Sequence, residues 1–86
     1  MKHAGADALD RLEPLLAQIR LLPKLKEKKR GLFSLKGRSL LHFHEDPAGL
    51  FADLGWQGRD LRLRVVEPAE QQRLLEAIEA ILAEAP

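Results

Sequence analysis

The chain has 86 residues, of which 45% are hydrophobic and 31% charged, a composition typical of one folded domain over residues 1–86 and not of a disordered segment. It contains no cysteine, which excludes disulfides, thiolate chemistry and metal sites built on sulfur. A formal net charge of +1 argues against a general polyanion binder, and no apolar run is long enough for a membrane span or a signal peptide, so we expect a cytoplasmic protein with no membrane partner.

An apolar stripe with helical spacing predicts a first helix that begins near residues 7–10 and ends at Pro23. Its members are Leu9, Leu12, Leu16 and Ile19. Asp7 and Asp10 are both suitable N-caps, and Asp10 stands three residues before Glu13 in a capping-box arrangement. The choice matters for Pro14, which lies in the first turn if Asp10 caps the helix and would kink the helix if Asp7 does.

Four strands and a second helix follow. Residues 24–30 form a basic tract without a clear period and predict a connection or an irregular edge segment. The strands are expected over residues 31–35, 38–44, 50–54 and 59–66, joined by short turns. Glu67 and Pro68 open the second helix, whose apolar face contains Leu74, Leu75, Ile78, Ile81 and Leu82. The order α-β-β-β-β-α predicts an α+β fold, a four-stranded antiparallel meander with two helices packed on one face.

Turn lengths predict the register of the strands. The connection of residues 46–49 pairs Glu45 with Leu50 and His42 with Asp53, and the next connection pairs Leu54 with Arg59. The apolar strand residues then face the helices, while the opposite face carries His42, His44, Asp53, Arg62 and Arg64. A bulge at Gly49 would shift the pairing by one residue and turn both histidines toward the helices, so their orientation stays open.

The same register places apolar side chains on the outer face of the sheet. They are Phe33, Leu35, Leu40 and Phe51. An exposed apolar patch usually marks an interface, and self-association is its simplest explanation. The leading hypothesis is therefore a small non-enzymatic interaction or regulatory module that acts as a homodimer.

Two other functions compete with this hypothesis. A basic surface could neutralise the phosphates of nucleic acid, or could be a solvated edge that prevents strand-to-strand aggregation. Its members are Lys24, Lys26, Lys28, Lys29, Arg30, Lys36 and Arg38. His42, His44 and Asp53 could instead bind a transition metal or perform acid–base chemistry. No motif spacing fixes a third ligand, and the chain has neither a nucleophile elbow nor a glycine-rich phosphate loop. We therefore predict no metal and no cofactor, and we lean away from an enzyme.

Segments in and around the hairpin resemble sequences of other proteins. The segments Gly31-Leu32-Phe33, Lys36-Gly37-Arg38 and His42-Phe43-His44-Glu45-Asp46-Pro47-Ala48-Gly49 resemble a family of small uncharacterised bacterial proteins. More loosely, the helix that stops at Leu22-Pro23, the Gly-x-Phe-x-x-x-Gly strand and the closing helix resemble YjbR-like domains, although this chain lacks their extended middle section. The second resemblance implies a cytoplasmic domain whose fold is likened to a DNA-binding one.

Residue usage is biased as well. Asn, Thr, Tyr and Cys are absent, and Leu, Ala, Arg and Glu dominate. Avoidance of thermolabile residues in a heat-adapted protein would produce part of this bias. Genomic base composition would produce much of the same bias, so a thermophilic origin is one of two explanations.

Overall fold

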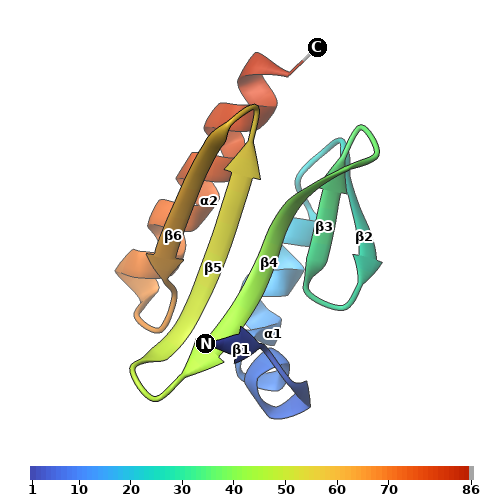
Figure 1. Ribbon diagram of the computed structural model, residues 1–86. Coiled ribbons are helices and arrows are strands. Elements are labelled where there is room, and N and C mark those ends of the chain that lie inside the picture. Colours follow the sequence, from blue (N-terminus) through green and yellow to red (C-terminus); the bar gives the residue numbers. More distant parts are fainter. Residues whose placement is uncertain (86) are drawn as a thin grey trace.

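The computed structural model describes residues 1–85, and Pro86, the last residue of the predicted domain, lies outside them. The structure has two helices, and Figure 1 shows them behind a single sheet, so the predicted α+β class with both helices on one face is confirmed. The sheet has six strands instead of four. The elements are β1 (Lys2–His3), α1 (Ala6–Arg20), β2 (Leu25–Lys29), β3 (Leu32–Leu35), β4 (Arg38–Asp46), β5 (Gly49–Trp56), β6 (Arg59–Arg64) and α2 (Pro68–Glu84).

Strand β4 organises the sheet. All pairings are antiparallel in the order β2-β3-β4-β5-β6, and β5 covers one edge of β4. The other edge is shared, because β3 pairs with the beginning of β4 and β1 pairs with its end, where His3 lies opposite His44. The basic tract thus supplies an edge strand, β2. Strand β1 was not predicted, since two residues carry no period.

Helix α1 begins earlier than either predicted cap allows. Its N-cap is Gly5, whose backbone N–H donates to Glu45 Oε2 at 2.7 Å. The prediction that Asp7 or Asp10 caps the helix is therefore wrong: β1 pairs with β4 up to His3, the bond from Gly5 to Glu45 fixes the chain directly before Ala6, and the helix starts there. Its end agrees with the sequence, because Leu21 is the C-cap and Pro23 follows.

Helix α2 begins at Pro68, as predicted, with Glu67 as its N-cap. Glu70 Oε1 accepts the backbone N–H groups of Val66 at 3.0 Å and of Glu67 at 2.8 Å. These bonds satisfy donors that a helix start leaves unpaired. Within residues 1–85, neither helix combines the length and the apolar character that crossing a membrane requires.

The predicted strand register is right for the β4–β5 hairpin and wrong for the β5–β6 hairpin. Glu45 pairs with Leu50 and His42 with Asp53, as predicted. In the following hairpin Leu54 pairs with Leu61 and not with Arg59. The turn there contains only residues 57 and 58, both with positive φ, the conformation that suits a two-residue hairpin turn. The error is two residues, so every side chain keeps its predicted face.

The core fills the space between the sheet and the helices. It also contains Phe33, Leu35 and Leu40, each at most 2% exposed, so their predicted place in an outward-facing interface is wrong. The cause is a bulge: Phe33 pairs with Leu41 whereas Ser34 pairs with Ser39, which leaves Leu40 as an extra residue in β4. Of the four proposed interface residues, only Phe51 is not buried.

Candidate metal centre

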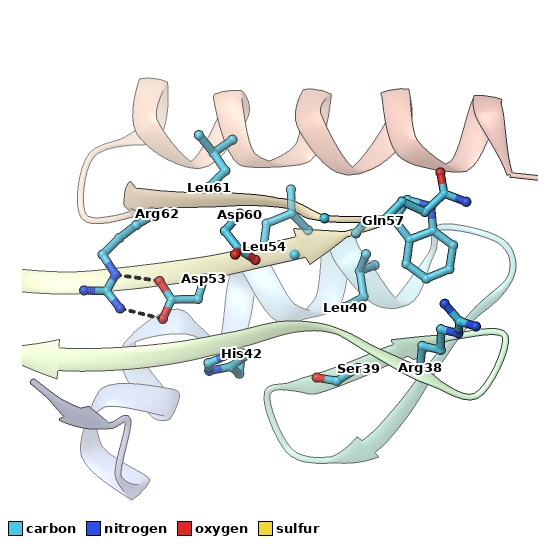
Figure 2. Close-up of a pocket in the computed structure, with 13 residues that line it drawn as sticks. Arg38, Ser39, Leu40, His42, Asp53, Leu54, Gln57, Asp60, Leu61 and Arg62 are labelled. Atoms are coloured by element: carbon cyan, nitrogen blue, oxygen red, sulfur yellow. Dashed lines mark hydrogen bonds and ion pairs between the residues drawn. The ribbon is translucent and has the colours of Figure 1, made fainter.

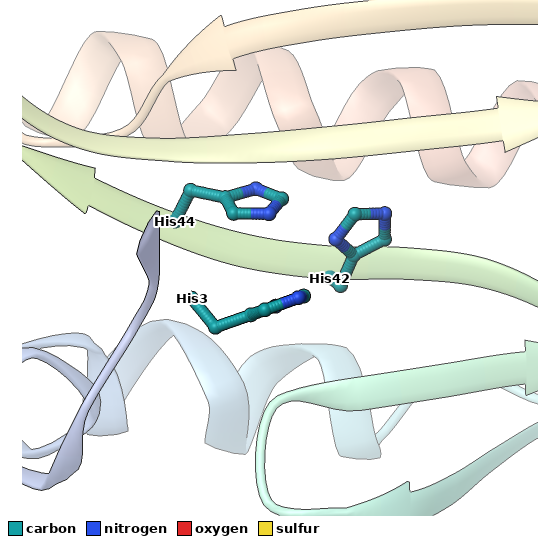
Figure 3. Close-up of side chains that lie close together, drawn as sticks. All are labelled: His3, His42 and His44. Atoms are coloured by element: carbon teal, nitrogen blue, oxygen red, sulfur yellow. The ribbon is translucent and has the colours of Figure 1, made fainter. Parts of the chain in front are cut away.

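The three histidines of the chain lie together on the face of the sheet that the helices leave open (Figure 3). The ring centroids of His3 and His44 are 4.7 Å apart, those of His42 and His44 are 4.7 Å apart, and those of His3 and His42 are 5.8 Å apart. One nitrogen from each ring belongs to a set whose members all lie within 4.8 Å of one another. We call these residues the histidine cluster.

Two strands position the cluster. Along β4 the buried Leu41 and Phe43 face the helices, and the alternation of a strand sends the rings of His42 and His44 to the opposite side. The orientation that the sequence left open is therefore outward for both rings, as the favoured register had it. His3 joins them because β1 pairs with the end of β4, which brings residues 41 positions apart in the sequence side by side.

Two nitrogens of the cluster have no hydrogen-bond partner. The Nδ1 atoms of His42 and His44 are buried from solvent, and within residues 1–85 nothing donates to them or accepts from them. A buried polar atom without a partner is costly, so most such atoms in proteins are paired. A positive ion between the rings would supply the missing partner.

Asp53 lies against the cluster from β5. Its Oδ2 is 2.9 Å from His44 Nδ1, a contact that becomes an ion pair only when the imidazole is protonated. Arg62 holds the carboxylate from β6, with Nε 2.6 Å from Oδ1 and Nη2 2.9 Å from Oδ2. Such a bidentate pair fixes the plane of the carboxylate beside the His44 ring.

These contacts determine the protonation of the site. Hydrogen bonds from Arg62 hold the pKa of Asp53 below its usual range, so this carboxylate is ionised at neutral pH. Burial lowers the pKa of His44, and the neighbouring histidines and Arg62 lower it further, while Asp53 opposes them. His44 is therefore neutral at neutral pH, and a neutral imidazole is the form that binds a metal.

The donor set fits a transition metal. Zinc binds imidazole nitrogen at about 2.0–2.1 Å in a tetrahedron, so two nitrogens on one ion lie roughly 3.3 Å apart. The widest separation of 4.8 Å would need to close by at most roughly 1.5 Å. His3 is the exposed member and lies on a two-residue strand, so it has the freedom to make most of that movement.

Four of the five residues predicted for the sheet face lie at this site, and the fifth lies elsewhere. His42, His44, Asp53 and Arg62 lie together as proposed. Arg64 does not join them, because its Nη1 pairs with Glu70 Oε2 at 3.0 Å, at the start of α2. His3 was missed, since no local pattern predicts the pairing of β1 with β4. The only available signal was that the chain has just three histidines.

The proposed basic surface is smaller than the sequence suggests. The amine of Lys24 donates to the carbonyls of Leu82 at 3.1 Å and Ala85 at 3.0 Å, where it satisfies acceptors at the end of α2. Arg30 pairs with Asp10 and Glu13, each at 2.8 Å. The exposed remainder is Lys26, Lys28, Lys29, Lys36 and Arg38.

Comparison with known proteins gives no further information about this site. No protein-family model, curated protein or solved structure matches the chain. The resemblances of the hairpin and of the helix–strand arrangement therefore stay predictions, and the site must be interpreted from its own residues.

Proposed function

We propose that this protein is a small transition-metal-binding module, with zinc as the best-suited ion, held by His3, His42 and His44. The observation that carries the proposal is the convergence of all three histidines, with one nitrogen of each within 4.8 Å of the others, and with the buried Nδ1 of His42 left without a hydrogen bond. Imidazole suits zinc, copper, iron and nickel, and zinc commonly takes three histidine nitrogens in a tetrahedral site. From the sequence alone we predicted no metal, and this proposal of a zinc site replaces that prediction.

Asp53 has a supporting place in this proposal. Carboxylates next to metal-bound histidines orient the ring and raise its basicity, and their loss commonly weakens metal binding 10–100-fold. The contact between Asp53 and His44, braced by Arg62, has this arrangement. Three nitrogen ligands leave one position of a tetrahedron open, which is typical of zinc sites that also bind a small molecule.

The experiment is a zinc titration of metal-free protein, followed by calorimetry and by competition with a chromophoric chelator. We expect one ion per chain in the wild type. Each of His3→Ala, His42→Ala and His44→Ala should weaken binding at least about tenfold, and Asp53→Asn should weaken it by a smaller factor. Lys2→Ala is the matched control, since it changes β1 without removing an imidazole.

A second measurement separates metal loss from misfolding. A ligand present at one hundred times its Kd stabilises the native state by about 2.7 kcal/mol, so zinc should raise the unfolding temperature of the wild type and of Lys2→Ala. The histidine variants should fold but lose this increase. Zinc binding of unchanged affinity in a His42→Ala, His44→Ala double variant would refute the proposal, as would a wild type that binds no zinc.

The homodimer hypothesis is retained as a separate proposal with less support. Phe51 alone remains of its four apolar residues on the open face, so a second copy would cover mostly polar groups. Light scattering on metal-free and zinc-loaded protein tests it. A monomer of 9.7 kDa in both states excludes a homodimer at the concentration used.

Nucleic-acid binding is likewise an alternative proposal, supported by the exposed lysines of β2. Lys26 and Lys28 lie on an edge strand, a position where lysines also serve to prevent aggregation. Retention on heparin that falls steeply with salt and disappears in a Lys26→Gln, Lys28→Gln double variant would favour it.

A further inference from the structure

We propose that the open face of the sheet binds a small organic anion next to the metal, with an oxygen-donor group on the ion and a flat apolar part against Trp56. The inference rests on the proposed metal site and names the class of ligand that this site takes. Its starting point is a pocket of about 690 Å³ that shares His42 with the histidine cluster. This volume is within the range of small-molecule sites.

The pocket follows the open face from the metal site to the β5–β6 turn. Figure 2 shows Arg62, Asp53 and His42 at one end and Gln57 and Arg38 at the other. Asp53 pairs with His42 and with Arg62 at the first end, and Trp56, three residues later at the end of β5, lines the second end. Three residues of a strand span roughly 10 Å. A ligand of about that length would reach both ends.

Coordination chemistry determines what binds at the first end. Three imidazoles leave a tetrahedral metal one ligand short, and Asp53 is not free to complete the set because both its oxygens are held by Arg62. Asp53 lines the pocket and also contacts His44, so a ligand in the pocket beside His42 would reach an ion held by the cluster. An oxygen donor from outside the protein would fill it.

The balance of charge favours an anion. Asp53 and Arg62 neutralise each other. Within residues 1–85 the guanidinium of Arg38 has no ion pair, and the carboxylate of Asp60 opposes it from across the pocket. A divalent ion adds two positive charges to this balance, so the loaded pocket is positive overall and attracts negatively charged molecules.

The second end suits an apolar, planar group. Trp56 lines it, and part of the indole is uncovered. Between the two ends the floor is formed by Gly55, where an added Cβ atom would approach Asp60 Oδ1 to 2.8 Å. The carboxylate of Asp60 therefore lies over Gly55, and a ligand that reaches the second end passes beside this carboxylate to place its ring against the indole.

The test uses full-length protein loaded with cobalt(II), whose visible spectrum changes when a fourth ligand binds, and with zinc for calorimetry. The probes are acetohydroxamate, which offers only the metal-binding group, and 2-naphthohydroxamate, which adds a flat apolar body. We expect the naphthyl compound to bind roughly tenfold more tightly to the wild type. It should also shift the indole N–H resonance of Trp56, the only tryptophan of the chain.

Variants at the far end of the pocket leave the metal ligands untouched. Trp56→Ala should retain its metal affinity and bind both probes equally. Lys29→Gln, which removes a basic residue outside the pocket, is the matched control. If metal binds but the two probes have equal affinity for the wild type, or Trp56→Ala keeps the preference, the ligand inference is wrong and the metal site stands. If no metal binds, both fail together.

Discussion

At the scale of single residues, Glu70 links the sheet to α2. One of its oxygens accepts the N–H groups of Val66 and Glu67, and Arg64 pairs with the same carboxylate. The backbone bond from Glu67 is the largest of the causes that hold the pKa of Glu70 below its usual value. The ionised form therefore stabilises the fold at any pH above the ordinary pKa, and this contribution is lost as the pH falls through the lowered one.

Glu70→Gln should remove this pH dependence. Its amide oxygen can still accept backbone bonds, but it cannot titrate, so the stability of the variant should fall less than that of the wild type between about pH 5 and about pH 3. Urea unfolding across this range measures the difference. Glu79→Gln, which removes an exposed carboxylate of the same helix, is the control and should follow the wild type. Parallel curves for all three proteins would contradict the role given to Glu70.

At the scale of elements, alternation of residue type predicted the faces of the sheet well. It placed Leu41 and Phe43 toward the helices and both strand histidines away from them, and turn length fixed the first hairpin register. Features that depend on one backbone conformation were not predictable. A non-glycine residue with positive φ, Gln57, makes the second turn, and a single extra residue, Leu40, makes the bulge. Neither the turn conformation nor the bulge can be recognised from residue type, because the pairing of the neighbouring strands imposes both.

Strand β3 shows what this bulge does to stability. Leu35 is fully buried, although the sequence suggested an exposed interface residue. Leu35→Ala should destabilise the protein by roughly 2–5 kcal/mol, since it leaves a cavity between the sheet and the helices. Denaturant unfolding measures this loss, and Phe51→Ala, at a half-buried position on the open face, should cost less. Unchanged stability of Leu35→Ala together with a smaller particle in light scattering would restore the interface interpretation.

At the scale of the whole molecule, the two terminal segments complete the architecture. Strand β1 brings His3 to the cluster, and the end of α2 accepts two hydrogen bonds from Lys24 at the entrance to β2. Both contacts join residues more than 40 positions apart, so no local pattern could predict them. The histidine cluster is therefore a product of topology, and analysis of the sequence singled out only two of its three members.

An ion-pair network connects α1 to the β2–β3 hairpin and bears on the prediction of heat adaptation. Glu13 is its centre, because it accepts hydrogen bonds from both Arg20 and Arg30, while Arg20 also pairs with Glu27. Networks of this kind gain importance at high temperature, where the cost of desolvating charges falls.

Glu13→Gln should therefore lower the unfolding temperature, and Glu76→Gln, outside the network, should change it little. The loss should shrink when salt reduces the Debye length from about 30 Å to about 3 Å, because the pairs are partly exposed. Calorimetric scans of both variants at low and high salt measure this, and an equal effect of the two substitutions would show that the network contributes nothing to heat resistance.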